Sequence, residues 1–310
     1  MAAVRGQTTV GAAQESLLVK RIRKTWPGYL FVLPGFLFFL VWTFYPLARS
    51  FVMSFFEWNL IKPSVFIGAD NYTSAINDPI FWIALGNTLF YVLVTVPGQM
   101  VLGLGIAVLL SKNIWGRDLF RVLYYLPVIT SWVVVSLLFI YLFNNQAGLI
   151  NYFLRDVLHV IDENINWLGE PANARWAIAS LGIWKGVGWT MIMFLAGLQA
   201  VDVTLYEAAS IDGAGAWQSF RRITLPLIRR TTLLILILLT IGAFQVFISV
   251  YVMTGGGPLS RTEVLLTYAY NNAFKSLNLG YGAALSYIFA GVVLLLNIVQ
   301  LRGLQGTKEE

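Results

Sequence analysis

Polar and aromatic residues cluster inside an apolar stretch near the middle of this chain. Lys185 is the one ionisable residue well inside it, and Trp189 follows four positions later, one turn along a helix. Charged groups in apolar surroundings are costly and usually face a cavity or a partner. An indole face can stack on a pyranose ring while nearby polar groups hydrogen-bond its hydroxyls, so the pattern favours a ligand cavity. A later apolar stretch adds Gln245 and Ser249. The expected cavity residues are therefore Lys185, Gly186, Trp189, Thr190, Gln245 and Ser249.

Each of these polar residues also has a purely structural interpretation. Lys185 could pair with an anionic ligand or with a helix carbonyl. Gln245 and Ser249 are spaced i, i+4 and would share one face of a continuous helix, where such groups often bond to another helix. Gly182 and Gly186 form a small-xxx-small pair that lets a second helix approach closely. Cavity lining and helix packing therefore both stay open for this cluster.

Catalytic and nucleotide-binding chemistry is missing from the sequence. The phosphate-loop pattern Gly-x4-Gly-Lys-Ser/Thr does not occur, so this chain should not bind or hydrolyse ATP itself. The one histidine, His159, stands near Asp156, Asp162 and Glu163, which is a weak metal signal, and we expect it to be exposed. There is no cysteine and no convergent catalytic set. We therefore expect a chain that is not an enzyme and that binds neither a metal nor a cofactor.

The composition is that of an integral membrane protein. Of the 310 residues, 58% are hydrophobic and 12% are charged, against about 25% charged residues in soluble domains. The net charge is +6, but the basic residues lie at the ends of apolar runs rather than in one patch. Nucleic acid is therefore not an expected partner. Six segments can each cross the roughly 30 Å of hydrocarbon in a bilayer. They are Tyr29–Ser50, Phe81–Leu110, Leu119–Phe143, Trp176–Ala200, Thr231–Met253 and Ala283–Leu301.

We predict an all-α integral membrane fold with six transmembrane helices over residues 29–303. A basic tail at 1–28 precedes it and a short tail at 304–310 follows. Pro97, near the middle of the long second segment, predicts a kink there or an extension beyond the membrane. The middle of the three long connections has the apolar spacing of a short surface helix over Leu149–Val160. These connections are residues 51–80, 144–175 and 254–282.

Lysine and arginine residues in the connections set the expected orientation. Fourteen of them lie on the side that holds both termini and the loop between the fourth and fifth segments, and six lie on the other side. Basic residues accumulate in the cytoplasmic loops of membrane proteins. Both termini and that loop are therefore predicted to be cytoplasmic.

The loop between the fourth and fifth segments is a polar island. Asp202 can cap a helix over Val203–Ile211, and Gly213 supplies a left-handed residue at its end. A second amphipathic segment covers Ala216–Ile223, and Pro226 opens the next apolar run where its missing N–H has little cost. Two short helices with a glycine bend predict a compact hairpin at the membrane surface, suited to binding a protein partner.

This loop resembles the cytoplasmic signature loop of the permease subunits of ABC-type importers. The pattern Glu-Ala-Ala, three residues, Gly-Ala and later Ile-Thr-Leu-Pro runs from Glu207 to Pro226. In that family the loop holds the coupling helix, which sits in a groove of the ATP-hydrolysing subunit. The resemblance implies the type I ABC importer permease fold, with a cytoplasmic coupling loop at 202–226 between helices 4 and 5. It assigns ATPase coupling to Tyr206, Glu207, Ala208, Ala209, Asp212, Gly213, Ala214, Phe220 and Pro226.

The rest of the chain resembles the sugar-importing branch of that family. Leu33-Pro34-Gly35 and Tyr45-Pro46-Leu47 in the first segment fit this branch, as does Gly255-Gly256-Gly257-Pro258 after the fifth. In maltose-type permeases an aromatic residue at the place of Trp189 helps to hold the sugar, and the carry-over extends to Gly186. Their sugar-binding asparagines are not reproduced in the fifth segment, which argues against maltose itself as the cargo.

The resemblance also implies a function and a set of partners. The chain would be a permease subunit that forms the pathway for a carbohydrate delivered by an extracytoplasmic solute-binding protein. A second homologous permease and two ATP-binding subunits, which hold ATP and Mg, would complete an importer in a bacterial or archaeal cytoplasmic membrane. The alternative is a secondary transporter or channel that is not driven by ATP. Such proteins usually carry inverted repeats and intramembrane carboxylates, and neither is evident here.

Overall fold

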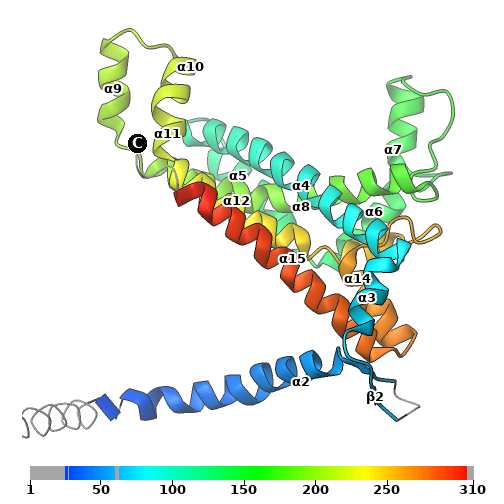
Figure 1. Cartoon of the computed structure of the whole chain (residues 1–310). Coiled ribbons are helices and arrows are strands. Elements are labelled where there is room, and N and C mark those ends of the chain that lie inside the picture. Colours follow the sequence, from blue (N-terminus) through cyan, green and yellow to red (C-terminus); the bar gives the residue numbers. More distant parts are fainter. Residues whose placement is uncertain (1–24, 27, 60–62, 306–310) are drawn as a thin grey trace, which may run out of the picture. The chain divides into compact units, whose positions relative to one another are not determined.

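The computed structural model describes residues 25–26, 28–59 and 63–305, which fall into two units divided after residue 53 (Figure 1). Most of the predicted N-terminal tail and the last five residues of the chain lie outside the described residues.

The first unit is a single long helix, Gly28–Met53. It contains a π-helical stretch, η1 (Leu40–Phe44), followed by α2 (Tyr45–Met53). Its 26 residues rise about 39 Å at 1.5 Å each, which is enough to cross a bilayer. Most of its large apolar side chains are exposed. This helix contains the whole of the predicted first crossing.

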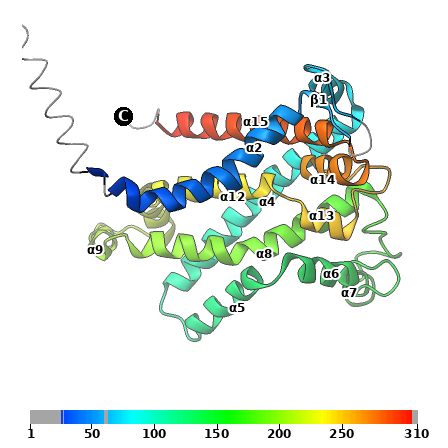
Figure 2. The same cartoon turned by 90° about the horizontal axis from the view of Figure 1, so that it is seen from below.

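The second unit is a bundle of apolar helices (Figures 1 and 2). Together with the first unit, the described residues contain five helices long and apolar enough to cross a membrane, and a bent helix pair that makes a sixth crossing. The predicted all-α fold with six crossings is thereby confirmed. The crossings of this unit are α4 (Pro79–Ser111), α5 (Arg117–Ile129) with α6 (Trp132–Leu142), α8 (Pro171–Gln199), α12 (Arg229–Phe244) with α13 (Ile248–Met253), and α15 (Leu279–Gln305).

The long second crossing, α4, runs unbroken through Pro97. Its 33 residues correspond to about 50 Å of helix, which exceeds the hydrocarbon thickness of a bilayer. This length is consistent with the extension beyond the membrane that was predicted for the segment.

The predicted third crossing, Leu119–Phe143, is not one continuous helix. α5 and α6 meet at a bend of 99°, because Thr130 and Ser131 between them adopt extended backbone conformations. The Thr130 hydroxyl donates to the Pro127 carbonyl at 2.6 Å, a local bond that competes with helix continuation. The prediction is wrong on this point, since an apolar composition does not reveal where a helix ends inside the membrane.

The fifth crossing is also interrupted. α12 ends at Phe244 and α13 begins at Ile248, and Phe247 between them leaves the helical conformation with φ −140° and ψ −62°. The prediction that Gln245 and Ser249 share one continuous helical face is therefore wrong. The break lies between the two residues.

α4 and α8 form the central pair of the bundle, and glycines allow their close approach (Figure 2). A Cβ atom at Gly103 would lie 2.7 Å from the Thr190 methyl group. The Gln99 amide packs against Gly186 and donates to the Gly182 carbonyl at 3.2 Å. Small residues let two helix backbones come together in this way. Large side chains that are fully buried around the contact are Tyr91, Ile178, Leu181, Met191 and Phe194.

The three long connections fold into small elements at one end of the unit, opposite α9 (Val203–Ile211) and α10 (Ala216–Ser219) (Figure 1). The predicted helix over Leu149–Val160 is present and ends at Val157. The elements are the antiparallel strands β1 (Phe56–Glu57) and β2 (Val65–Phe66), α3 (Asp70–Asn77), α7 (Leu149–Tyr152) with η2 (Phe153–Val157), and α14 (Leu265–Tyr270) with η4 (Asn271–Lys275).

Asp78 ties this end of the unit together. Its carboxylate caps α4 by accepting the Ile80 N–H at 2.8 Å, and it accepts the hydroxyls of Tyr268 on α14 and, at 3.1 Å, Tyr281 on α15. Burial and the bond to Asp78 raise the pKa of Tyr268 to about 12. The Tyr268 hydroxyl therefore keeps its proton and stays a donor at physiological pH.

The glycine contact between α4 and α8 gives a matched stability test. Gly103→Ala should destabilise the purified protein by about 1–3 kcal/mol, because the added methyl group meets Thr190. Gly105→Ala on the same helix meets nothing within 4 Å and should be neutral or stabilising by up to about 1 kcal/mol. Thermal unfolding in detergent measures both variants. Equal stability of the two would contradict the packing described here.

Candidate functional site

The hairpin between α8 and α12 begins with the predicted helix cap. The Asp202 carboxylate accepts the Thr204 N–H at 3.0 Å, and α9 then covers Val203–Ile211. This bond to the backbone N–H holds the pKa of the exposed Asp202 carboxyl below its ordinary value. The cap is therefore fully formed at neutral pH and is lost only as the pH falls through the lowered pKa of Asp202.

Gly213 makes the bend that was predicted for it. Its φ of +77° lies in the left-handed region that favours glycine. The Ala214 N–H donates to the Ala209 carbonyl at 2.9 Å and closes the helix end. Across the hairpin, the Tyr206 hydroxyl and the Thr224 hydroxyl are 2.9 Å apart, and this bond joins its two arms.

The returning arm is more irregular than the sequence predicted. The segment Ala216–Ile223 is divided between α10 and the π-helical η3 (Phe220–Thr224). Pro226 lies in the short helix α11 (Leu225–Leu227), and the next long helix, α12, begins only at Arg229. Pro226 therefore precedes the apolar helix rather than opening it.

The hairpin presents an exposed surface with no partner among the described residues. Glu207, Ala208 and Asp212 are exposed, and Ala209, Ala214 and Phe220 are half-buried. Sequence reasoning missed the large apolar side chains that are exposed here. The three most exposed are Val203, Ile211 and Trp217, with exposed fractions of 66%, 87% and 72%. Apolar residues inside a polar island were the signal that could have identified them, because exposed apolar groups of this kind mark binding surfaces.

A cavity of about 470 Å³ lies in the bundle. Both interrupted crossings border it, since Trp132 stands directly after the first break and Gln245 lies within the second. Gly182, Gly186 and Gly242 have no side chains and therefore present backbone to the cavity. The other lining residues are Tyr91, Thr95, Gln99, Ile178, Trp189, Leu238, Leu239, Ala243, Val246, Phe247, Ile248 and Ser249.

The cavity contains four of the six expected residues: Gly186, Trp189, Gln245 and Ser249. Sequence reasoning missed its other aromatic and amide groups, which come from α4, from the start of α6 and from the second break. The missed residues with polar or aromatic groups are Tyr91, Thr95, Gln99, Trp132 and Phe247. Tyr91, Thr95 and Gln99 are spaced four residues apart on α4, and this helical spacing was the signal that could have grouped them. Trp132 and Phe247 join them only through the packing of separate helices.

Lys185 and Thr190 lie elsewhere, although Lys185 was expected to face the same cavity as Trp189. Lys185 is buried, and its ammonium donates to carbonyls at the end of α5. Thr190 is buried against Gly103 of α4, and its hydroxyl donates to the Gly186 carbonyl at 3.2 Å. Of the two interpretations given for Lys185, the structure contains the bond to helix carbonyls.

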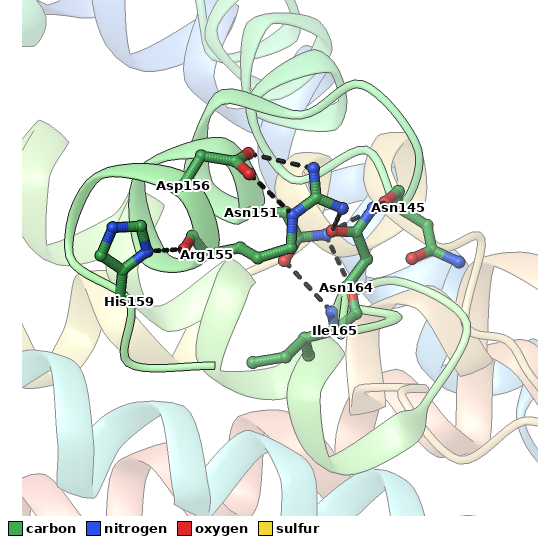
Figure 3. A network of polar contacts seen from close by, with 7 residues as sticks. All are labelled: Asn145, Asn151, Arg155, Asp156, His159, Asn164 and Ile165. Atoms are coloured by element: carbon green, nitrogen blue, oxygen red, sulfur yellow. Dashed lines mark hydrogen bonds and ion pairs between the residues drawn. The ribbon is translucent and has the colours of Figure 1, made fainter. Parts of the chain in front are cut away.

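The single histidine belongs to an exposed polar network, shown in Figure 3. The His159 ring nitrogen lies 2.9 Å from the Arg155 carbonyl, while the Arg155 guanidinium pairs with Asp156 at 3.0 Å. Asn151 organises the loop by donating to the Asn145 and Ile165 carbonyls. No group of three or more potential metal ligands occurs in the described part of the chain. His159 is exposed, as predicted.

The Asp202 cap can be tested by hydrogen exchange on the isolated protein at pH 7. Asp202→Ala should speed exchange of the Thr204 amide about fivefold, because its acceptor is lost. Asp212→Ala is the matched control, since no backbone N–H in the described residues donates to its side chain. Unchanged exchange at Thr204 in Asp202→Ala would show that the cap does not order α9.

Comparison with known proteins identifies the family. Residues 99–303 match the family described as binding-protein-dependent transport system inner membrane component. The probable ABC transporter permease protein YurN of Bacillus subtilis is 33% identical over 287 residues, 91% of this chain and 97% of that protein. The sulfoquinovosyl glycerol transport system permease protein SmoG of Agrobacterium fabrum is 39% identical and covers 83% of each chain. The lactose transport system permease protein LacF of Rhizobium radiobacter is 36% identical, over 88% of this chain and 92% of that one.

A solved structure has the same fold. A chain of a bacterial ABC transporter involved in the import of the acidic polysaccharide alginate superposes with a TM-score of 0.83 at 24% identity, over 94% of this chain and 99% of that chain. The phosphate-loop sequence needed to bind ATP is absent here, in keeping with a membrane component. This chain therefore belongs to the binding-protein-dependent transport system inner membrane components, and it is a permease subunit of an ABC transporter rather than an enzyme.

Proposed function

We propose that this permease forms the import pathway for a carbohydrate that an extracytoplasmic solute-binding protein delivers. The observation that carries the proposal is the cavity beside the two broken crossings. Non-helical backbone at membrane depth is tolerated where it is buried in protein or lines a water-filled cavity. A polar path for solute would provide such surroundings for the backbone at both breaks.

The lining of the cavity suits a sugar. Trp132 and Trp189 offer aromatic surfaces from two different helices, and Gln99 and Gln245 offer amide groups. Aromatic rings pack on the C–H faces of a pyranose while amides bond to its hydroxyls. The described residues that line the cavity carry no charged side chain, which favours a neutral saccharide.

The printed names of relatives also support carbohydrate cargo, since one is a lactose permease and another a sulfoquinovosyl glycerol permease.

The α9–α11 hairpin is proposed as the docking site of the ATP-hydrolysing subunits. It exposes Val203, Ile211 and Trp217 beside Glu207, which forms no ion pair in the described part of the chain. This chain and a second homologous permease would each hold one ATPase. ATP and Mg would bind to those partners, since this sequence has no phosphate loop.

The basic residues support an orientation with the hairpin and both termini on the cytoplasmic side of the bacterial or archaeal inner membrane. The binding protein would then approach the opposite end, where α3, α7 and α14 lie (Figure 1). A solved alginate importer described in complex with a pentasaccharide-bound periplasmic protein supports this side for delivery. Closure of the ATPases would move the hairpin, which connects directly to α8 and α12, and these two helices contribute to the cavity wall.

The cargo proposal predicts a difference between two tryptophans of α8. Trp189→Leu should raise the KM for the transported sugar about fivefold to tenfold, because a stacking surface in the cavity is lost. Trp184→Leu is the matched control, since Trp184 packs against Phe139 outside the cavity and should leave KM unchanged. Uptake of radiolabelled sugars by vesicles that contain the whole transporter gives both values. Equal KM values for the two variants would count against the cavity as the sugar site.

The coupling proposal predicts that Glu207→Arg separates ATP hydrolysis from uptake. Charge reversal on the docking face should lower uptake by at least tenfold while the permease still inserts, because a buried contact with a mismatched charge costs several kcal/mol.

Gly213→Ala should also reduce uptake, since alanine is strained at φ +77°. Gly215→Ala is the matched control, since Gly215 has open space around it and an ordinary φ of −71°. Vesicle uptake and ATPase rates are measured together. Normal ATP-driven uptake by Glu207→Arg, or uptake without ATP, would refute the proposal and favour a secondary transporter.

A further inference from the structure

The ammonium group of Lys185 makes three hydrogen bonds to one short piece of backbone. Its Nζ lies 2.8 Å from the Pro127 carbonyl, 3.3 Å from that of Val128 and 2.7 Å from that of Thr130. The residue is only 3% exposed. Lys185 comes from the middle of α8, whereas the carbonyls lie where α5 ends and the third crossing turns by 99°.

In the described residues Lys185 is the one donor to the carbonyls of Val128 and Thr130, while the Pro127 carbonyl also accepts the Thr130 hydroxyl. The last carbonyls of any helix have no partner within it, and here the chain turns away before another helical turn can form. A cation at a helix C-terminus is also favoured by the helix dipole. Gly188, one turn further along α8, makes the contact possible, because any side chain there would collide with the Tyr124 carbonyl of α5.

The same ammonium group touches the wall of the cavity. It lies 4.9 Å from the ring centre of Trp132, the first residue of α6, and that ring belongs to the cavity lining. A cation at this distance attracts the face of an indole. Lys185 therefore links three things: the end of α5, the start of α6 and one aromatic wall of the cavity.

We propose that Lys185 is a positioning residue that holds the third crossing in its bent form and fixes Trp132 in the cavity wall. The effect of Lys185 on transport rests on the proposed function, because Lys185 would act through the contact between Trp132 and the sugar. Its effect on the bend is independent of which solute is carried. The two effects are measured separately.

The bend can be measured by distance between spin labels. The chain has no cysteine, so labels go only to engineered sites, Leu119→Cys on α5 and Leu138→Cys on α6, which are 59% and 50% exposed. A straight helix would hold these sites about 28 Å apart, and the bend brings them closer. In the full-length chain in lipid nanodiscs, Lys185→Met should lengthen or broaden the distance distribution, while Lys185→Arg should keep it narrow.

A matched control separates this effect from the loss of any cation on α8. Arg175, also on α8, lies 5.2 Å from the ring centre of Phe90, which is outside the cavity lining. Arg175→Met should leave the label distance unchanged. Lys185→Gln serves as a second variant, since its shorter amide cannot reach all three carbonyls, and it should also broaden the distribution. Wild-type distributions for both Lys185→Met and Lys185→Gln would overturn the proposal.

A double-mutant cycle tests the link to Trp132. In sugar uptake by the whole transporter, Lys185→Met and Trp132→Leu should each raise KM about fivefold, and the double variant should raise it no further than the stronger single variant. Multiplicative effects would show that Lys185 acts independently of Trp132 and would overturn that part of the proposal. Absence of sugar uptake by the wild-type transporter would instead refute the proposed function, and the label distances would still decide the role of Lys185.

Discussion

Backbone polar groups inside a membrane must find hydrogen bonds within the protein or in a water-filled cavity, and this constraint acts most strongly where a crossing is broken. The described residues contain two such breaks, at Thr130–Ser131 and at Gln245–Phe247. At the first, the Lys185 ammonium and the Thr130 hydroxyl satisfy the free carbonyls. At the second, residues of the break border the cavity. The position of the cavity therefore follows from where the helices are interrupted.

The close pairing of α4 and α8 determines the opposite side of the cavity. Glycines at their contact bring the two backbones together, and the Gln99 amide bonds to the α8 backbone while it also borders the cavity. Helices that associate through van der Waals contact in lipid depend on this kind of small-residue fit. The closely packed pair and the two interrupted crossings together enclose the cavity.

The hairpin obeys different rules because it lies outside the apolar bundle. Its form depends on interactions within the hairpin itself. They are an aspartate cap, a glycine in the left-handed region and one hydrogen bond between a tyrosine and a threonine side chain that joins the arms. These are short-range interactions, so the hairpin can keep its shape while its exposed apolar residues remain available to a partner. A preformed surface of this kind loses little conformational entropy when it binds.

The sequence by itself determined the membrane class, the number of crossings, the helix Val203–Ile211 with its cap, and the family. These features depend on composition and on residues that are neighbours along the chain. Only the tertiary structure decided where the third and fifth crossings break, that Tyr91, Trp132 and Gln99 join Trp189 at one cavity, and that Lys185 points to α5 instead. The physical reason is that these contacts join residues far apart in the sequence. Lys185 and Pro127, for example, are 58 positions apart, and a carbonyl that lacks a partner leaves no trace in the pattern of side chains.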